Sequence, residues 1–424
     1  MQYLYTALIY LLRPAALGLV LWRGLRNRAY WEALSERFGM GPSFGGPTIW
    51  VHAVSLGEVT AAAPLVRALL ARYPQLPLVL TTATPTGRAR ALALFGASVA
   101  VHFLPYDTPG SVRRFLMRVR PRLGIVMETE LWPNLFRQCL RSGTPMMLAS
   151  ARLSPKSVAR YRRFSGLFAG MIAETFVAAQ TAEDAERFIA IGAARGRTRV
   201  VGNVKFDVAG DGAAVERGRL LRSAYWSDRP VWIAGSTHAG EEEQVLEAHA
   251  ELLAEVPGAL LLLVPRHPER FQAVADLIGR RGFRFERRST AGAVQPDSQV
   301  LLVDTVGELA TLYAAVDVAF VGGSLVPVGG HNLLEAAAVG LPVLTGPFHS
   351  NAKEIARQLL LHGGALQVDD AAQLAQALKR LFADAELRGR VGASGQQVIE
   401  VNRGAVARLM QWLESLVGPS LVIP

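Results

Sequence analysis

Three carboxylates in the first half of the chain stand where apolar runs end. Glu58 lies in HAVSLGEVTAA, just after the run at residues 48–51, and Glu128 and Glu130 follow an apolar run in METELWPN. Buried close together, these acids would titrate as a coupled group, which suits them to acid–base work. Lys205, in GNVKFD, is a candidate partner for a negative group.

The same residues also have ordinary structural interpretations. Ser55 and Glu58 have capping-box spacing, in which Ser55 accepts from the amide of Glu58 and Glu58 accepts from the amide of Ser55. A positive helix end lowers the pKa of such a carboxylate, whereas a second carboxylate such as Glu128 and exclusion of water raise it. Most lysines are exposed, so Lys205 could simply face solvent.

The second half contains a glycine-rich stretch between a predicted strand and a predicted helix, GGSLVPVGGHNLLE at residues 322–335. Glycines at such a turn let backbone amides approach a ligand, and a helix N-terminus favours anions. Glu335 could accept hydrogen bonds from a ribose diol. The alternative is a tight turn in which Asn332 is an N-cap and Glu335 its capping-box partner.

Three further helix starts repeat this pattern. Arg266 and His267 follow LLLLVP, Ser236 and Thr237 end VWIAGST, and VDTVGEL supplies a fourth start. An arginine there suits a phosphate or a sugar carboxylate, although this run could also be solvated and pair with Glu269. Four polar helix starts on one sheet edge predict a nucleotide site. Threonines in TTATPTG could line a sugar site in the same way. The further candidate residues are Ser55, Gly57, Thr84, Ser236, Thr237, His267 and His331.

Two repeats of alternating strands and helices must position these side chains. After residue 46, apolar runs typical of strands alternate with helical stretches, and the same alternation begins again near residue 231. This pattern predicts two doubly wound α/β domains with parallel sheets. A ligand would bind in a cleft between the carboxyl ends of the sheets. We predict an anchor at 1–30, a first Rossmann-like domain at 31–210 and a second at 211–424, with a linker around 207–229. Helix-type sequence after residue 370 could cross back to the first domain.

Composition narrows the functional classes. The formal net charge of +10, mostly from arginine, could serve an anionic membrane, phosphorylated substrates or nucleic acid. No recognisable nucleic-acid module is present, so no nucleic-acid partner is expected. The one cysteine, Cys139, excludes an internal disulfide. Neither zinc spacing nor a D-x-D pair is found, so no metal is expected.

The first residues, MQYLYTALIYLLRPAALGLVLW, are apolar over about the length that a bilayer requires. They lack a signal-peptide cleavage site, and Arg23, Arg26 and Arg28 on the C-terminal flank would keep the body on the cytoplasmic side. Arg13 and Pro14 interrupt the run, so the helix could span the membrane, lie in its interface, or be a core helix.

A resemblance to a known protein family covers roughly residues 1–400. The chain resembles the bacterial Kdo transferases of lipopolysaccharide synthesis, Kdo being 3-deoxy-D-manno-octulosonic acid. The resemblance rests on an ordered series of segments: HAVSLGE, TTATPTG, PYDTPGSVRRF, ETELWPN, ARLS, GNVKFD, AGSTHAGEEE, PRHPERF, DTVGEL and GGSLVPVGGHNLLE. The resemblance implies the GT-B architecture, in which two Rossmann-like domains face each other across a cleft. It also implies an inner-membrane anchor, CMP-β-Kdo as donor, the lipid A precursor lipid IVA as acceptor, and no cofactor.

The resemblance also implies roles for individual residues. Glu58 matches the family's general base, and Glu128 and Lys205 match positions that support the transition state. The positions matching the CMP-binding segments are Pro265, Arg266, Val306, Gly307, Glu308, Asn332, Leu333, Leu334 and Glu335. The chain departs from the family at Leu333 and Ala336, where proline is common, and at Val306, where methionine is common. These apolar changes concern the rigidity of a backbone-reading loop more than the chemistry.

The implied reaction is an inverting transfer through an oxocarbenium-like transition state. It needs a base for the acceptor hydroxyl, and cations or amides for the leaving phosphate. The sequence leaves two alternatives: an inverting glycosyltransferase of the same architecture that uses a UDP-sugar, and a catalytically inactive, membrane-anchored nucleotide-binding protein. The second is disfavoured because Glu58, Glu128, Lys205 and Arg266 are all present.

Overall fold

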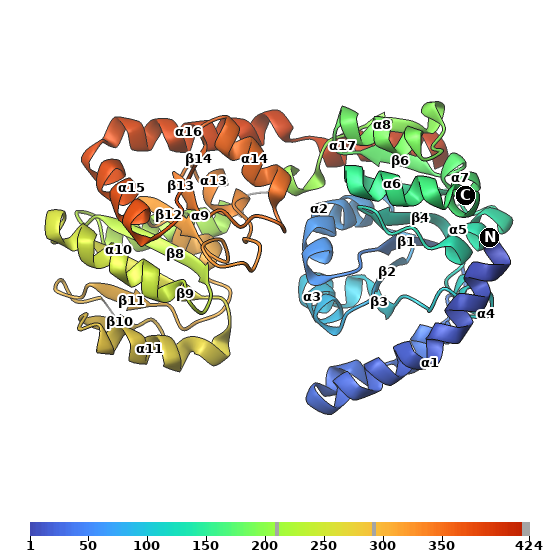
Figure 1. Ribbon diagram of the computed structural model, residues 1–424, viewed down its shortest axis with the longest axis horizontal. Helices are drawn as coiled ribbons and strands as arrows, with labels where there is room; N and C mark the ends of the chain where they lie inside the picture. Colours follow the sequence, from blue (N-terminus) through green and yellow to red (C-terminus); the bar gives the residue numbers. More distant parts are fainter. Residues whose placement is uncertain (208–211, 291–293, 418–424) are drawn as a thin grey trace. The chain divides into compact units, whose positions relative to one another are not determined.

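Alternating apolar runs and helices build two parallel sheets, as predicted, in the computed structural model, which describes residues 1–207, 212–290 and 294–417 (Figure 1). Residues up to Asp207 form one unit together with the C-terminal segment that starts at Asn402. The residues between them form the second unit.

The sheet of the first unit has seven parallel strands in the order β3-β2-β1-β4-β5-β6-β7. Its strands are β1 (Thr48–His52), β2 (Leu78–Thr82), β3 (Ala100–Phe103), β4 (Pro121–Met127), β5 (Met146–Ala151), β6 (Phe176–Ala179) and β7 (Thr198–Val200). Its longer helices are α1 (Gln2–Arg26), α2 (Leu56–Arg72), α3 (Pro85–Phe95), α4 (Pro109–Val119), α5 (Pro133–Arg141), α6 (Pro155–Arg163), α7 (Ser165–Ala173), α8 (Ala182–Ala190) and α17 (Ala405–Val417).

Strands β1, β2 and β5 of this sheet are buried along their whole length, as expected of parallel strands covered on both faces. Leu65 of α2 and Leu409 of α17 belong to one core cluster, and Phe115 of α4 and Phe188 of α8 belong to the other. The last helix therefore packs on the first unit. Its start is held by Asp207, whose carboxylate accepts from the amides of Gly404 (2.6 Å) and Val406 (2.5 Å).

The second unit repeats the design with the strand order β10-β11-β9-β8-β12-β13-β14. Its strands are β8 (Val231–Thr237), β9 (Leu260–Pro265), β10 (Phe285–Arg287), β11 (Val300–Leu302), β12 (Val318–Val321), β13 (Val343–Thr345) and β14 (Ala365–Gln367). Its helices are α9 (Gly212–Tyr225), α10 (Glu242–Glu255), α11 (Phe271–Arg280), α12 (Leu309–Tyr313), α13 (Leu334–Ala338), α14 (Lys353–Leu361), α15 (Ala371–Ala383) and α16 (Ala385–Asn402). Helices α10, α11 and α15 share one core cluster with the sheet.

The predicted linker at 207–229 is wrong over most of its length, because Gly212–Tyr225 form α9. Its residues 208–211 lie outside the described residues. Gly218 in this helix permits close packing: a Cβ there would lie 2.3 Å from the carbonyl oxygen of Thr311 and 2.6 Å from the Cβ of Ala314. Gly218 therefore allows α9 to approach α12.

Helix α1 has the length and composition of a membrane-crossing segment, and its most apolar stretch is not buried in the protein. It is a candidate membrane anchor. Polar contacts join its first turns to the body of the first unit: Tyr5 Oη donates to Asp107 Oδ2 (2.8 Å), and Thr6 Oγ1 donates to Asn134 Oδ1 (3.1 Å). The guanidinium of Arg13 lies 5.7 Å from the ring centre of Phe38.

Candidate active site

Glu58 lies in the first turn of α2, where β1 ends and the helix begins. Its Oε2 accepts from the amide of Val54 at 2.8 Å, and the Ser55 side chain makes no capping hydrogen bond. The predicted capping box is therefore wrong. The carboxylate binds the amide one residue before the one that the spacing implied. The backbone of Ser55 is extended there (φ −132°, ψ 170°), and the amide of Val54 donates to Glu58.

Burial of the carboxyl group raises the pKa of Glu58 to about 7. The amide of Val54 opposes this rise, the nearby carboxylates of Glu128 and Glu130 add to it, and Lys205 counteracts it. Burial and like charge thus outweigh the amide of Val54 and the charge of Lys205 in setting the pKa of Glu58. A carboxylate with this pKa is half ionised near neutral pH, which is the range that suits a general base.

Glu128 follows β4 and forms two ion pairs. Its Oε1 accepts from Lys205 Nζ at 2.7 Å, and its Oε2 accepts from Arg152 Nε at 2.9 Å. Burial alone would raise the pKa of Glu128, but the two cations outweigh burial and hold it below the ordinary value. The structure therefore brings Glu58, Glu128 and Lys205 into one group of interacting charges, in which Lys205 partners a negative group, as the sequence suggested.

The backbone of Glu128 is strained, with a φ of +53° that non-glycine residues seldom adopt. Its amide still donates to the carbonyl oxygen of Ala149 (2.9 Å), which ties the end of β4 to β5. Strain of this kind persists where surrounding contacts over-determine it, and it is common at functional sites. Burial, followed by the charge of Glu128, raises the pKa of the neighbouring Glu130.

Other predicted residues of the first unit have local roles. Thr84 is the N-cap of α3 and accepts from the amide of Gly87 at 3.1 Å, so its hydroxyl is partly committed to the helix start. Gly57 is exposed in the first turn of α2. The hydroxyl of Thr82 donates to the carbonyl oxygen of Val54 (3.0 Å), which fixes the ends of β1 and β2 to each other.

The second unit gathers three histidines at strand ends. His238 Nε2 and His331 Nε2 are 2.8 Å apart, and the rings of His238 and His267 meet edge to face with centres 5.2 Å apart. Burial, with contributions from His238, Arg266 and His267, lowers the pKa of His331 to about 4. His331 is therefore neutral at physiological pH, and the hydrogen bond joins two imidazoles of which one donates.

Arg266 follows β9, and its amide donates to the carbonyl oxygen of Thr237 at 2.9 Å. Its exposed guanidinium has no hydrogen-bond or ion-pair partner among the residues that the structure describes. His267 Nδ1 lies 3.8 Å from Glu269 Oε1, so His267 does pair with Glu269, as the alternative of a solvated charged run suggested. Pro265 and Thr237 are buried, and Ser236 has a strained φ of +59°.

The helix start at Asn332 is a compact hydrogen-bonded turn. Asn332 Oδ1 accepts from the amide of Leu334 (3.2 Å), and its Nδ2 donates to Glu335 Oε1 (3.1 Å). The helix begins at Leu334 and its N-cap residue is Leu333, so the alternative in which Asn332 is the N-cap is wrong. The side chains of Leu333 and Leu334 are buried, so any contact these two residues make with a ligand must come from the backbone.

The fourth predicted helix start is exposed. Val306 is 78% exposed, and Gly307 has a φ of +92°, which favours glycine. Glu308 Oε1 and Oε2 lie 3.3 Å from Arg288 nitrogens, and these contacts together with Thr305 outweigh burial and lower the pKa of Glu308.

Sequence reasoning missed two residues that organise these sites. Arg152 directly follows β5, a strand-end position that could have signalled its pairing with Glu128. Glu241 is fully buried, and its carboxylate accepts from four amides, those of His238 (3.1 Å), Gly323 (2.6 Å), Ser324 (2.9 Å) and Leu325 (2.8 Å). Glu241 thus holds the glycine-rich loop against the start of α10, and the string EEE gave no signal of which glutamate would do so.

Among the residues that the structure describes, no group of three or more His, Cys, Asp or Glu side chains is arranged to hold a metal ion. The charged groups at these sites are instead the carboxylates, amines and guanidiniums described above.

Two family profiles match the chain. The profile described as 3-deoxy-D-manno-octulosonic-acid transferase (kdotransferase) matches residues 32–208, and that of glycosyl transferases group 1 matches residues 243–398. The 3-deoxy-D-manno-octulosonic acid transferase of Haemophilus influenzae is 42% identical to this chain over 97% of this chain and 98% of its own length. The corresponding enzyme of Bordetella pertussis is 40% identical over 97% of this chain and 99% of its own length.

Solved structures agree on the fold. Anabaena HepE is 16% identical and matches with a TM-score of 0.57 over 87% of this chain and 99% of its own. UDP-GlcNAc 2-epimerase from Neisseria meningitidis is 11% identical and matches with a TM-score of 0.58 over 86% of this chain and 100% of its own. With the two parallel sheets, they confirm the predicted Rossmann-like domains of the GT-B architecture. The full-length similarity to the two bacterial enzymes shows that the chain belongs to the Kdo transferase family.

Proposed function

We propose that this Kdo transferase moves Kdo from CMP-β-Kdo to lipid IVA with inversion, without a cofactor, and with Glu58 as the general base. The observation that carries the proposal is the carboxylate of Glu58, whose pKa burial raises to about 7, beside a Glu128 that Lys205 and Arg152 keep ionised. Two nearby carboxylates with pKa values displaced in opposite directions are typical of divided catalytic roles.

In the proposed reaction, an acceptor hydroxyl oxygen attacks the anomeric carbon of Kdo while the bond from that carbon to the phosphate oxygen breaks. CMP leaves with the bonding electrons, and Glu58 takes the hydroxyl proton. Lys205 and Arg152 surround Glu128 and can offset the negative charges of the donor. The oxocarbenium-like transition state gains from the nearby ionised carboxylate of Glu128.

The nucleotide of the donor is proposed to bind the second unit. The guanidinium of Arg266, which has no partner in the part of the chain that the structure describes, suits the phosphate, and Asn332 and Glu335 offer amide and carboxylate oxygens to a ribose. The backbone of Val306–Glu308 and of Leu333 and Leu334 would complete the CMP contacts, with Pro265 fixing the turn. The neutral His331 can contribute a hydrogen bond without a charge.

The proposal places the enzyme at the inner membrane, with α1 as the anchor and the body on the cytoplasmic side. Length and composition of α1 support anchoring. The formal net charge of +10 supports attraction to an anionic bilayer, where a phosphorylated lipid acceptor would reside.

The direct test is transfer of Kdo from freshly made CMP-Kdo to lipid IVA by the purified full-length protein, followed by mass spectrometry. A mass increase of one or more Kdo units is expected. If the wild-type protein adds no Kdo mass to lipid IVA under conditions in which a related Kdo transferase does, the proposed substrate pair is wrong.

CMP is expected to raise the unfolding temperature of the protein, whereas UDP at the same concentration leaves it nearly unchanged. A ligand that binds only the native state stabilises it by RT ln(1 + [L]/Kd), so a hundredfold excess over Kd gives about 2.7 kcal/mol. Differential scanning fluorimetry measures both shifts. Greater stabilisation by UDP would favour the UDP-sugar alternative.

The turnover number is expected to rise with pH through an inflection near 7, because only ionised Glu58 accepts the proton. Lys205→Met should move this inflection to higher pH, since Lys205 lowers the pKa of Glu58. The measurement is kcat from pH 5.5 to 9 for both proteins. The exposed Lys156→Met on α6 is the matched control and should leave the inflection in place. An inflection that moves downward in Lys205→Met contradicts the assignment.

A further inference from the structure

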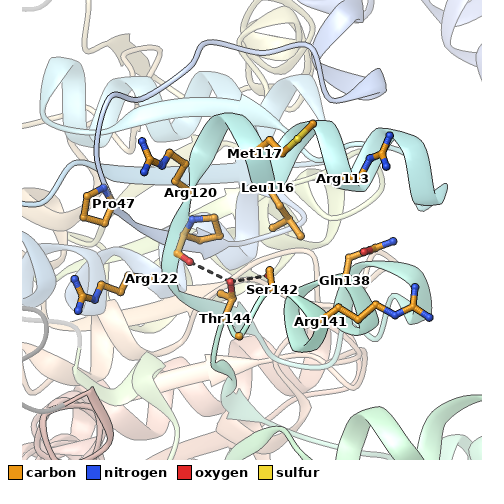
Figure 2. A pocket seen from close by; sticks show the side chains of 12 residues that line it. Pro47, Arg113, Leu116, Met117, Arg120, Arg122, Gln138, Arg141, Ser142 and Thr144 are labelled. Atoms are coloured by element: carbon orange, nitrogen blue, oxygen red, sulfur yellow. Dashed lines mark hydrogen bonds between the residues drawn. The ribbon is translucent and has the colours of Figure 1, made fainter.

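A cavity of about 590 Å³ opens in the first unit between the C-terminal ends of α4 and α5 and the first residues of β4 (Figure 2). Pro121, at the start of β4, and Thr144, just before β5, belong to its lining. Glu128 follows the other end of β4. Because the strands are parallel, this cavity lies at the amino-end edge of the sheet, away from the carboxylates of the candidate active site.

The lining carries four arginines, Arg113, Arg120, Arg122 and Arg141, and no acidic residue among the described residues. Figure 2 shows Arg113 and Arg141 at one end and Arg120 and Arg122 at the other, with the hydroxyls of Ser142 and Thr144 between them. We call this site the arginine pocket.

Three of these guanidiniums are free to bind a ligand. Arg120 donates to the carbonyl oxygen of Gly45 at 3.0 Å. Arg113, Arg122 and Arg141 make no hydrogen bond or ion pair with the rest of the chain that the structure describes, and their side chains are exposed. Arg114, in the same helix as Arg113, differs from these three: its guanidinium donates to the carbonyl oxygen of Phe38 and to the hydroxyl of Ser111.

The local field is strongly positive. Two helix C-termini meet at the pocket, and each contributes only about half a negative charge, whereas the four arginines supply four positive charges. This positive charge also acts on the neighbouring Arg137. Burial is the main cause that lowers the pKa of Arg137, and the charge of Arg141 lowers it further. A multivalent anion would relieve the repulsion among these arginines.

We propose that the arginine pocket is a binding site for a phosphate-bearing anion, separate from the site of Kdo transfer. Guanidinium groups bind phosphate oxygens through paired N–H donors, and two arginine pairs match a ligand with more than one negative charge better than a single carboxylate. The apolar wall formed by Leu116 and Met117 can accept an uncharged part of the same ligand. A soluble diphosphate and a phospholipid headgroup share this chemistry.

The test uses the full-length protein in non-ionic detergent and two probes, inorganic pyrophosphate and dihexanoyl phosphatidic acid below its micellar concentration. The pocket variant combines Arg113→Gln, Arg122→Gln and Arg141→Gln. The control variant combines Arg67→Gln, Arg163→Gln and Arg280→Gln, which removes the same charge from exposed arginines outside the pocket that have no partner in the described chain. Isothermal titration calorimetry at fixed ionic strength gives the dissociation constants.

At least one probe is expected to bind the wild-type protein, and the pocket variant is expected to bind it at least tenfold more weakly, while the control variant changes less than twofold. Tighter binding of pyrophosphate identifies a soluble phosphate ligand, and tighter binding of phosphatidic acid identifies a lipid headgroup. Should the pocket variant fold poorly, the exposed single change Arg122→Gln, compared with Arg67→Gln, is expected to weaken binding about threefold or more. Absence of binding by both probes, or equal weakening in the pocket and control variants, overturns the proposal.

Discussion

Glu58→Gln is expected to lower the turnover number of Kdo transfer by about 10²–10⁴-fold, the usual contribution of a positioned general base. The amide oxygen of glutamine can still accept from the Val54 amide that Glu58 binds at 2.8 Å, so the start of α2 should be preserved. What is lost is the basic oxygen that takes the acceptor proton. The measurement is kcat at pH 8 with saturating donor and acceptor.

The same change is expected to stabilise the protein at pH 8. Because burial raises the pKa of Glu58 to about 7, the folded protein binds this proton more tightly than the unfolded chain does. The stability due to that proton is fully present below the ordinary value of 4.5 and is lost as the pH rises through about 7. The ionised carboxylate therefore destabilises the fold at pH 8, and glutamine removes that cost. The gain in unfolding temperature should shrink at pH 5.

Glu174→Gln on the exposed surface of the first unit is the matched control and should change neither kcat nor stability appreciably, since its ion pair with Arg197 is exposed. A purely structural Glu58 would give a less stable variant with little loss of turnover. Near-normal turnover in Glu58→Gln, at any stability, removes it from the proposed role.

Most of the fold followed from apolar runs. The central strands of both sheets, such as β1 (TIWVH) and β12 (VAFV), are mostly apolar and buried, because parallel strands are covered on both faces. The three strands that sequence reasoning missed, β7 (TRV), β10 (FER) and β14 (ALQ), are three-residue edge strands. A strand that short with a charged or polar residue carries no periodicity, and only pairing with a neighbour defines it.

The candidate site was predictable to the level of which strand ends carry polar residues, and no further. Glu58 and Glu128 both follow predicted strands and interact, whereas Lys205, which pairs with Glu128, was only a candidate partner for a negative group. The capping partner of Glu58 was wrong by one residue, because it depends on backbone dihedrals that spacing alone does not determine. The strand-end position of Arg152 could have signalled its pairing with Glu128, but three of the four amides that bind Glu241 lie more than 80 residues away in sequence, so spacing gave no signal of that role.

Glu241→Gln is expected to destabilise the second unit by about 3 kcal/mol or more. Each carboxylate oxygen of Glu241 accepts from two backbone amides, so glutamine must direct its NH₂ group at two N–H donors whichever way it turns. Two charge-assisted hydrogen bonds are lost, each contributing about 1.5–3 kcal/mol, and the freed amides stay buried. That is a large fraction of the roughly 5–15 kcal/mol that stabilises a domain.

Thermal unfolding followed by circular dichroism should show a fall of about 6–12 °C for Glu241→Gln, taking roughly 2–4 °C per kcal/mol for a domain of this size. Glu247→Gln, an exposed position on the same helix, is the matched control and should fall by less than about 1 °C. The glycine-rich loop that Glu241 holds leads to His331 and Asn332, so stabilisation by CMP should weaken as well. If both variants unfold at the same temperature, the four amides do not depend on the Glu241 carboxylate, and the loop must be held by its glycine conformations and by the hydroxyl of Ser324, which accepts from the amide of Gly346 at 2.8 Å.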